Sequence, residues 1–375
     1  MNNQLNIDWP HFLANYWQKK PVILRQAFPH FCDPITPDEL AGLALEQEIE
    51  SRLVSNLDQK WQATYGPFTE QDFTQLGETN WSLLVQAVDH WHDQAATLVA
   101  PFRCFPQWLF DDLMISYAVP EGGVGPHIDQ YDVFIIQGMG KRRWRVGDIN
   151  PNYKQFCAHP ALLHVEAFTP IIDQEMTAGD VLYIPPGFPH DGVCLETSLS
   201  YSVGFRSPTA QALVTGFADY LLEHDLGKVH YTDPNLTLPP DPLNVSPHEI
   251  ERLKSMMIAL INQPDYFNHW FGEYISQSMH SLNIESVEPP YHVDEVIATF
   301  KQGSQCHLVN SIRLIKVAET YYIHGEALDL PRPMIEKISH LHYFDQSAIA
   351  EFIDDKKVMN QFTHWLNRGY WYFVD

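Results

Sequence analysis

The middle of the chain, from about residue 110 to residue 206, consists of short apolar runs separated by Gly, Pro and Asp turns. Each run is rich in β-branched and aromatic residues, as is typical of β-strands. The runs read DLMISYAV, DVFIIQG, RRWRVGD, AFTPIID, DVLYIPP and TSLSYSVGF. Strands that follow one another so closely predict a sandwich, a barrel or a jelly roll.

The flanking regions show the 3.6-residue apolar spacing of helices. Residues 1–100 are expected to be mainly helical, with DELAGLALEQE and TNWSLLVQAVDHWHDQAATL as the clearest segments. After Arg206, helices are expected in SPTAQALVTGFADYLLEHDL and PHEIERLKSMMIALINQ, joined by the Pro-rich DPNLTLPPDPLNVSP. The last segment predicts a helix in VDEVIATFKQG, a hairpin in RLIKVAETYYIHGEAL and a helix in FIDDKKVMNQFTHWLNRG.

A chain of 375 residues is long for one domain. The changes between helical and strand patterns along the chain predict a domain over 1–207 with its β core at about 100–207, a helical region over 208–280, and a last domain over 281–375. An α+β class follows from this mixture.

The amino-acid composition limits the compartments and the partners that can be expected. The five cysteines are odd in number and form no CxxC, which favours reduced thiols in a cytoplasmic protein over a disulfide framework or a zinc ribbon. No signal peptide and no apolar run long enough to span a membrane are expected. The net charge of −24 argues against general nucleic-acid binding and favours a basic partner, although acidity also serves solubility alone.

Histidines followed two residues later by a carboxylate are candidates for metal binding, because such pairs share a strand face. Random placement of 19 His and 47 acidic residues gives about 2.4 such pairs, and the chain holds four. Three of them are interpreted as structural or surface pairs: His164/Glu166, His292/Asp294 and His324/Glu326. Asp294 suits the first turn of a helix, and His324/Glu326 suits a hairpin turn.

The fourth pair, His127/Asp129, follows the glycine-rich PEGGVGP and precedes a strand. A second strand end, GDVLYIPPGFPHDG, fixes His190 behind three prolines. Two strands of one closed sheet can bring such residues together at a barrel mouth. Two histidines and one carboxylate form the facial triad that binds Fe(II) and leaves positions open, so a metal site of His127, Asp129 and His190 is predicted.

These strings carry a family resemblance. GPHIDQYDVFIIQGMGKRRWRV and LYIPPGFPHDG, together with SYSVGFRSP, resemble the JmjC-type, cupin-like Fe(II)/2-oxoglutarate oxygenases. Within them, the chain resembles the bacterial ribosomal oxygenases from NIDWPHFLANYWQKKPVILRQAF to NRGYWYFV. The resemblance implies a double-stranded β-helix core, a C-terminal domain like a winged helix, and use of Fe(II), 2-oxoglutarate and O₂. It also implies hydroxylation at the β-carbon (C3) of an arginine in large-subunit ribosomal protein number sixteen, with release of succinate and CO₂.

The far carboxylate of 2-oxoglutarate needs a cation inside the barrel. In Lys141-Arg142-Arg143-Trp144-Arg145-Val146, Arg142 shares the parity of the apolar Trp144 and Val146 and is predicted to point inward, rather than being a surface cation. The resemblance agrees. Ser116 and Ser202 are candidates to donate to the cosubstrate.

Asp112, Met114 and Tyr131 are candidates to bind the substrate, because a carboxylate and an aromatic face suit a guanidinium. Ordinary strand packing is the competing interpretation of each.

A homodimer through residues 208–280 is expected, because this region contains many large apolar side chains that could form an interface. Packing of these side chains within one chain is the alternative. The apolar residues are Met256, Met257, Leu260, Ile261, Phe267, Trp270 and Phe271. Two other functions stay open: a cupin-like binding or regulatory protein with an idle metal site and a winged-helix tail, and a non-oxidative cupin isomerase.

Overall fold

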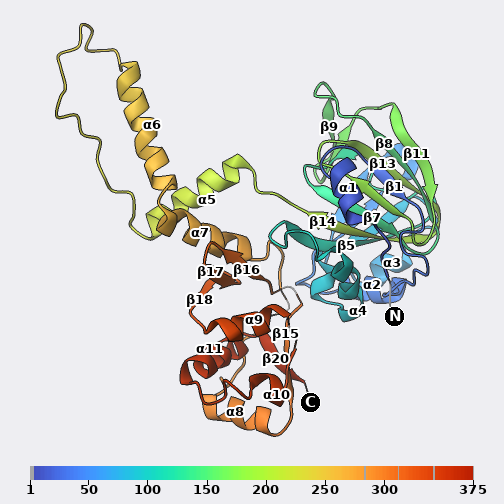
Figure 1. The fold of residues 1–375 in the computed structure, drawn as a ribbon. Coiled ribbons are helices and arrows are strands. Elements are labelled where there is room, and N and C mark those ends of the chain that lie inside the picture. The colour runs from blue at the N-terminus through green and yellow to red at the C-terminus, as the bar shows by residue number, and fades with distance from the viewer. Residues whose placement is uncertain (1–3, 283, 311, 341–342, 375) are drawn as a thin grey trace. The chain divides into compact units, whose positions relative to one another are not determined.

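The structure is a computed structural model that describes residues 4–282, 284–310, 312–340 and 343–374. The chain forms two compact units (Figure 1). The first comprises residues 1–207 and 279–283, and the second comprises 208–278 and 284–375.

The first unit is built on a large antiparallel sheet in the order β1-β12-β7-β14-β5-β4-β2-β3. Its strands are β1 (Val22–Leu24), β2 (Ser51–Ser55), β3 (Gln62–Tyr65), β4 (Trp81–Val85), β5 (Phe110–Ala118), β7 (Asp132–Gln137), β12 (Val181–Ile184) and β14 (Ser198–Phe205). A smaller sheet has the order β11-β8-β13-β6, from β6 (His127–Ile128), β8 (Lys141–Gly147), β11 (Pro170–Met176) and β13 (Pro189–Glu196). The hairpin of β9 (Gln155–His159) and β10 (Leu162–Val165) completes this unit's strands among the described residues. The two sheets form a double-stranded β-helix, as the family resemblance implied.

Strand β7 is buried on both faces and separates two parts of the core. Phe134 and Ile136 belong to an aromatic-rich cluster with Phe12 of helix α1 (Trp9–Asn15). Val133 and Ile135 point the other way, into the space between the two sheets, where they pack with residues such as Trp144 of β8. Alternate side chains of β7 therefore pack into two different parts of the core, one outside the barrel and one inside it.

The expectation of a mainly helical N-terminal region is wrong for part of its length. Helix α2 (Pro37–Leu43) confirms the first helical segment, and α3 (Glu70–Thr74) and α4 (Asp93–Ala96) are short. The second predicted segment instead begins with strand β4, whose last four residues are all buried. A strand with both faces buried carries no period-2 alternation, so its apolar run cannot be told from a buried helix by periodicity.

The second unit carries the four helices predicted after Arg206, which are α5 (Ala210–Glu223), α6 (Pro247–Ile261), α8 (Val293–Lys301) and α11 (Lys356–Asn367). It also contains α7 (Pro264–Ser276), α9 (Arg332–His340) and α10 (Gln346–Ile349), which lie outside the predicted segments. The predicted late hairpin is extended to a three-stranded sheet of β16 (Leu314–Val317), β17 (Thr320–Ile323) and β18 (Glu326–Leu328). A second small sheet joins β19 (Tyr343–Phe344), β15 (Gln305–Leu308) and β20 (Trp371–Val374). No helix of the described residues is long and apolar enough to cross a membrane.

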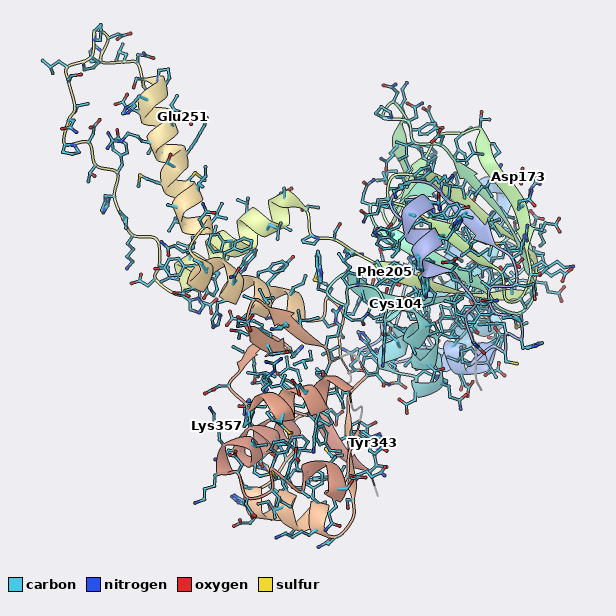
Figure 2. All side chains as sticks on the ribbon, viewed as in Figure 1. Cys104, Asp173, Phe205, Glu251, Tyr343 and Lys357 are labelled. Carbon is cyan, nitrogen blue, oxygen red and sulfur yellow. The ribbon has the colours of Figure 1, made fainter. Side chains whose placement is uncertain are left out.

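Helix α6 differs from the other long helices because none of its residues is buried. Its exposed apolar side chains include Ile250, Leu253, Met257, Ile258 and Ile261. Figure 2 shows the side chains of α6, where Glu251 is labelled, projecting without a covering layer along most of the helix. By contrast, Trp270 of α7 is buried, so some of the apolar side chains expected at a dimer interface pack within the chain instead.

Candidate metal and ligand site

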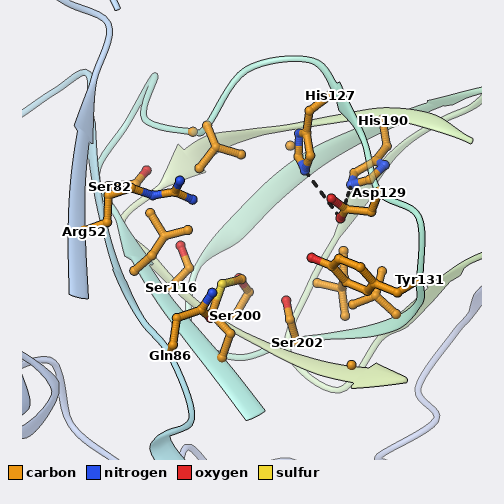
Figure 3. Close-up of a pocket in the computed structure, with 18 of the residues that line it drawn as sticks. Arg52, Ser82, Gln86, Ser116, His127, Asp129, Tyr131, His190, Ser200 and Ser202 are labelled. Atoms are coloured by element: carbon orange, nitrogen blue, oxygen red, sulfur yellow. Dashed lines mark ion pairs between the residues drawn. The ribbon is translucent and has the colours of Figure 1, made fainter. Parts of the chain in front are cut away.

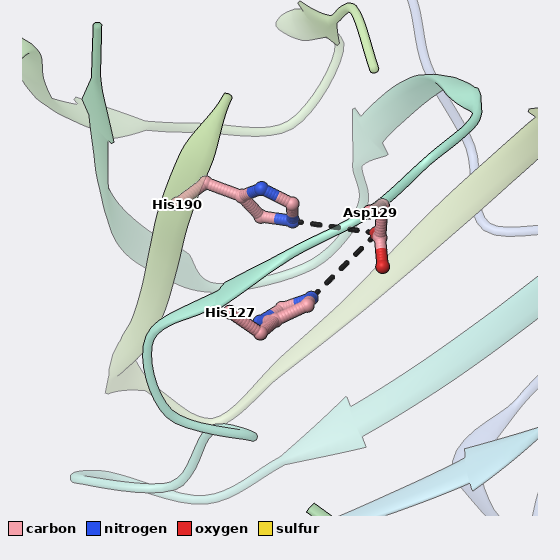
Figure 4. A group of neighbouring side chains, drawn as sticks. All are labelled: His127, Asp129 and His190. Carbon is pink, nitrogen blue, oxygen red and sulfur yellow. Dashed lines mark ion pairs between the residues drawn. The ribbon is translucent and has the colours of Figure 1, made fainter. Parts of the chain in front are cut away.

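Two neighbouring strands bring the predicted metal ligands together. His127 on β6 lies directly opposite His190 on β13 in the antiparallel pairing, and Asp129 follows β6. The Oδ2 atom of Asp129 lies 3.6 Å from Nε2 of His127 and 3.5 Å from Nε2 of His190 (Figure 4). Figure 4 shows the three side chains converging on one point from the two strands.

Backbone carbonyls fix the orientation of both imidazole rings. Nδ1 of His127 lies 2.9 Å from the carbonyl oxygen of Gly125, and Nδ1 of His190 lies 3.0 Å from that of Phe188. Because a carbonyl can only accept, each Nδ1 must donate its proton. Nε2 of each ring then faces Asp129 and is the atom that would bind a metal ion, which is the arrangement that metal-binding histidines use.

The three donors fit a divalent metal. Their ligand atoms lie within 4.8 Å of one another, and two imidazole nitrogens with one carboxylate oxygen are a donor set that such metals accept. Burial opposes the charge of Asp129, but the neighbouring His127 and His190 outweigh it and hold the pKa of this carboxyl well below its usual value. The carboxylate is therefore ionised and available as a ligand.

Arg142 lies inside the barrel, as its parity predicted, with only 5% of its surface exposed. Its Nε donates to Oγ of Ser198 at 2.9 Å, and its Nη2 donates to the carbonyl oxygen of Ser116 at 2.9 Å. Burial lowers the pKa of Arg142 to about 10, so the group stays protonated at neutral pH. Among the described residues no carboxylate pairs with this guanidinium, which leaves it able to bind an anionic ligand.

The other cations of β8 point outward and are paired. Lys141 lies 2.7 Å from Glu196, and Arg143 lies 2.6 Å from Asp173. Arg145 pairs with Asp191. The strand alternation thus divides one basic run into a buried ligand-binding cation and three surface ion pairs.

Arg142 and the three predicted metal ligands line one cavity of about 300 Å³, and Figure 3 shows part of its lining.

 Ser116, Ser200 and Ser202 line it from β5 and β14, between the metal-binding residues and the wall formed by Arg52, Ser82 and Gln86. The predicted Ser116 and Ser202 therefore both face the space in which an anionic ligand of Arg142 would lie.

The predicted substrate residues Asp112, Met114 and Tyr131 line the same cavity. Asp112 is buried, and its Oδ2 accepts a hydrogen bond from the backbone N–H of Ala87 at 2.8 Å. The ring of Tyr131 is already in contact with a cation of this chain, because the guanidinium of Arg206 lies 5.3 Å from the ring centroid. Burial raises the pKa of Tyr131, so its hydroxyl keeps its proton.

The other three His-x-acid pairs do not join the triad. Nε2 of His164 lies 2.9 Å from the carbonyl oxygen of Val124, so this histidine lines the cavity but points its ring nitrogen at the backbone. His292 is the N-cap of α8, with Asp294 in the first turn of that helix. His324 has a φ of 44° in the turn between β17 and β18. These positions agree with the structural interpretation.

Sequence reasoning missed several residues that line the site. Ser200 shares the parity of Ser202 on β14, so strand alternation could have identified it. Ser198 shares this parity too, and its Oγ accepts a hydrogen bond from Arg142. Arg52, Ser82 and Gln86 lie on or beside strands that were not expected. Asp111 lies on β5 just before the predicted run DLMISYAV, and Arg206 follows β14. His280 reaches the cavity from a distant part of the sequence, for which no local signal exists.

The fold and the site define a class. A double-stranded β-helix that carries two histidines and an aspartate on paired strands, with a buried arginine across the cavity, is the architecture of the JmjC-type oxygenases. Family models agree: residues 97–213 match the JmjC domain, and residues 259–372 match the ROXA-like winged helix.

Individual relatives cover the whole chain. It is 50% identical to the ribosomal protein uL16 3-hydroxylase of Escherichia coli over the full length of both chains. It is 30% identical to a probable ribosomal oxygenase of Haemophilus influenzae, over 96% of this chain and 94% of that protein. The X-ray structure of E. coli YcfD matches it with a TM-score of 0.95 at 50% identity, covering both chains completely. A structure of YcfD in complex with cobalt and 2-oxoglutarate matches with a TM-score of 0.92 at 48% identity, again over both full chains. The chain belongs to the ribosomal oxygenase family.

Proposed function

We propose that this protein is an Fe(II)- and 2-oxoglutarate-dependent hydroxylase of a large-subunit ribosomal protein. The observation that carries the proposal is the pairing, within one cavity, of the His127/Asp129/His190 cluster with the buried cation of Arg142. A metal-binding cluster and a separate carboxylate-binding cation are what a metal-chelating dicarboxylate requires.

His127, Asp129 and His190 would hold the metal, and their placement on one side of it leaves positions for other ligands. When bound, Fe(II) and 2-oxoglutarate supply with O₂ the oxidising power for C–H hydroxylation, with release of succinate and CO₂. Arg142 would bind the far carboxylate of the cosubstrate, held in position by Ser198 and the backbone of Ser116. Ser116 and Ser202 would add hydroxyl groups to this pocket.

The substrate we propose is ribosomal protein uL16, modified at the β-carbon (C3) of an arginine. Support comes from the E. coli relative, which is named a ribosomal protein uL16 3-hydroxylase. Asp112 would bind the guanidinium, and Met114 and Tyr131 would flank its plane. An arginine cannot displace a metal ligand by coordinating the ion, because its guanidinium stays protonated.

A homodimer through α5–α7 completes the proposal. The exposed apolar residues of α6, with Met257 at 65% exposure, are what a second copy would cover. We place the activity in the cytoplasm, where a ribosomal protein meets its modifying enzyme before or during assembly.

A binding or regulatory protein with an idle metal site remains the competing function. It predicts no turnover, whereas the oxygenase predicts release of succinate from 2-oxoglutarate in the presence of Fe(II), O₂ and uL16. Incubation with uL16, and with an acidic protein as the control, followed by quantification of succinate separates the two. Release that depends on uL16 supports the proposal, and no release with either protein would refute it.

A further inference from the structure

His280 lies at the proposed guanidinium-binding end of the cavity, although it comes from the short segment 279–283. This segment packs with the first unit, while the residues before and after it in the sequence belong to the second. The Nε2 atom of His280 lies 3.6 Å from Oδ1 of Asp111 and 3.8 Å from Oδ2 of Asp112. All three residues line the cavity.

The two carboxylates are an unusual pair to bury. Asp111 and Asp112 are 8% and 7% exposed, so two adjacent negative charges of β5 are largely removed from water. Such a pair favours protonation of one member unless cations stand beside it. Arg206 supplies one cation, since its Nε lies 3.0 Å from Oδ2 of Asp111. His280 is the group positioned to supply the other, to Asp112.

We infer that His280 is a positioning residue of the substrate pocket, which as a cation keeps Asp112 ionised so that this carboxylate can bind the substrate's guanidinium at neutral pH. The inference rests on the proposed function, because it assumes that Asp112 binds the arginine. His280 itself need not touch the substrate for this role.

The electrostatic surroundings support the inference. Burial raises the pKa of Asp112 to about 6, with Asp111 and Asp89 adding to the shift and His280 opposing it. The neighbouring carboxylate of Asp111 raises the pKa of His280, against the effect of burial and with further help from Asp112 and Glu50. Other charged or titratable groups near the pair include Arg206, Tyr131, whose pKa is raised by burial and in part by Asp112, and His90, which lies 3.8 Å from Asp89.

The direction of the pH effect follows from these charges. A protonated Asp112 is neutral and cannot pair with a guanidinium, so substrate binding weakens as the pH falls through the pKa of Asp112. Loss of the cation at His280 raises that pKa, because the ionised form of Asp112 loses a favourable neighbour. The weakening must then begin at a higher pH.

The test is the KM for an arginine-containing uL16 peptide, measured between pH 5.5 and pH 9 in the wild type and in His280→Gln. In the wild type we expect the KM to rise as the pH falls through about 6. In His280→Gln the same rise should begin about one pH unit or more higher, and the two enzymes should converge at the alkaline end. His280→Lys restores a cation and should return the profile toward that of the wild type.

Three controls separate the outcomes. His30→Gln changes an exposed histidine of the same unit and should leave the profile unaltered. An unchanged KM for 2-oxoglutarate in His280→Gln shows that the barrel is intact. Asp112→Asn should raise the peptide KM at neutral and alkaline pH and remove its rise toward acid pH. If it does not, the proposed substrate pocket is wrong. If it does, but His280→Gln keeps the wild-type profile or is raised equally at every pH, only the role of His280 is refuted.

Discussion

At the scale of single residues, the site depends on what each polar side chain is bonded to. Arg142 is held by a serine hydroxyl and a carbonyl, neither of which neutralises it, whereas Arg143 on the same strand is neutralised by Asp173. A buried cation held by neutral groups keeps its charge for a ligand, and a surface ion pair does not. Mutation of Arg142 should therefore weaken 2-oxoglutarate binding, whereas mutation of Arg143 should not.

We expect Arg142→Ala to raise the KM for 2-oxoglutarate by roughly tenfold to a hundredfold, because a charge-assisted hydrogen bond contributes about 1.5–3 kcal/mol. Arg143→Ala and Arg145→Ala are matched controls on the outer face of β8 and should change it little. Initial rates of succinate formation at varied 2-oxoglutarate concentration measure the effect. A KM that responds to Arg143 and not to Arg142 would refute the assignment.

Some residue positions in the site could be predicted from the sequence, and others could not. Strand parity predicted that Arg142 points inward, because alternation is a local property of the backbone. The meeting of His127 with His190 was predicted from two turn motifs and a closed sheet. The contact of His280 with Asp112 had no such basis, since it depends on where a segment of irregular structure returns to the barrel.

At the scale of elements, the loop before β6 determines where His127 lies. Gly125 has a φ of +79°, a conformation that residues with a Cβ rarely adopt, and its carbonyl oxygen accepts the hydrogen bond from Nδ1 of His127. A Cβ on Gly125 would lie 2.4 Å from Cε1 of His164. The glycine-rich segment before His127 thus allows the backbone to pass close to His164 and to orient a metal-binding imidazole.

Gly125→Ala is expected to weaken metal binding by about tenfold, because groups that orient a metal ligand typically contribute that much or more. Gly42→Ala, with nothing within 4 Å of the added Cβ, is the control and should bind metal as the wild type does. Titration with Mn²⁺ followed by electron paramagnetic resonance measures the affinity without turnover. Unchanged affinity in Gly125→Ala would show that the loop does not position His127.

Strand β4 marks the limit of prediction at this scale. Its apolar run was interpreted as helix because both faces of the strand are buried, and its pairing with β2 and β5 is a long-range property. By contrast, the six strand runs between 110 and 206 had clear turn residues at their ends and were predicted correctly. Hence these six barrel strands could be found from the sequence. Strands β6 and β13, which carry His127 and His190, were not among the predicted runs, and neither was the extension of the large sheet by β4, β2 and β3.

At the scale of the whole molecule, two features are not explained by the active site: the exposed apolar face of α6 and the net charge of −24. Each suggests an interaction with another chain: the apolar face with a second copy, and the acidity with a basic ribosomal protein.

Met257→Glu should convert a dimer into a monomer, because it places a charge at the centre of the exposed apolar face of α6. Ala259→Glu lies on the opposite side of the same helix and should remain dimeric. Light scattering at micromolar concentration gives the mass of each. A wild-type protein that is strictly monomeric would contradict the assembly, and apolar packing within one chain would then be the use of these residues.

The central claim is that the His127/Asp129/His190 cluster drives hydroxylation of an arginine. The most direct measurement is tandem mass spectrometry of a uL16 peptide after incubation with the protein, Fe(II), 2-oxoglutarate and O₂. The account predicts a gain of one oxygen atom at the β-carbon of one arginine, no gain with Asp129→Ala, and poor turnover of a peptide with lysine in place of that arginine. Full activity of Asp129→Ala, or equal turnover of the arginine and lysine peptides, would contradict it.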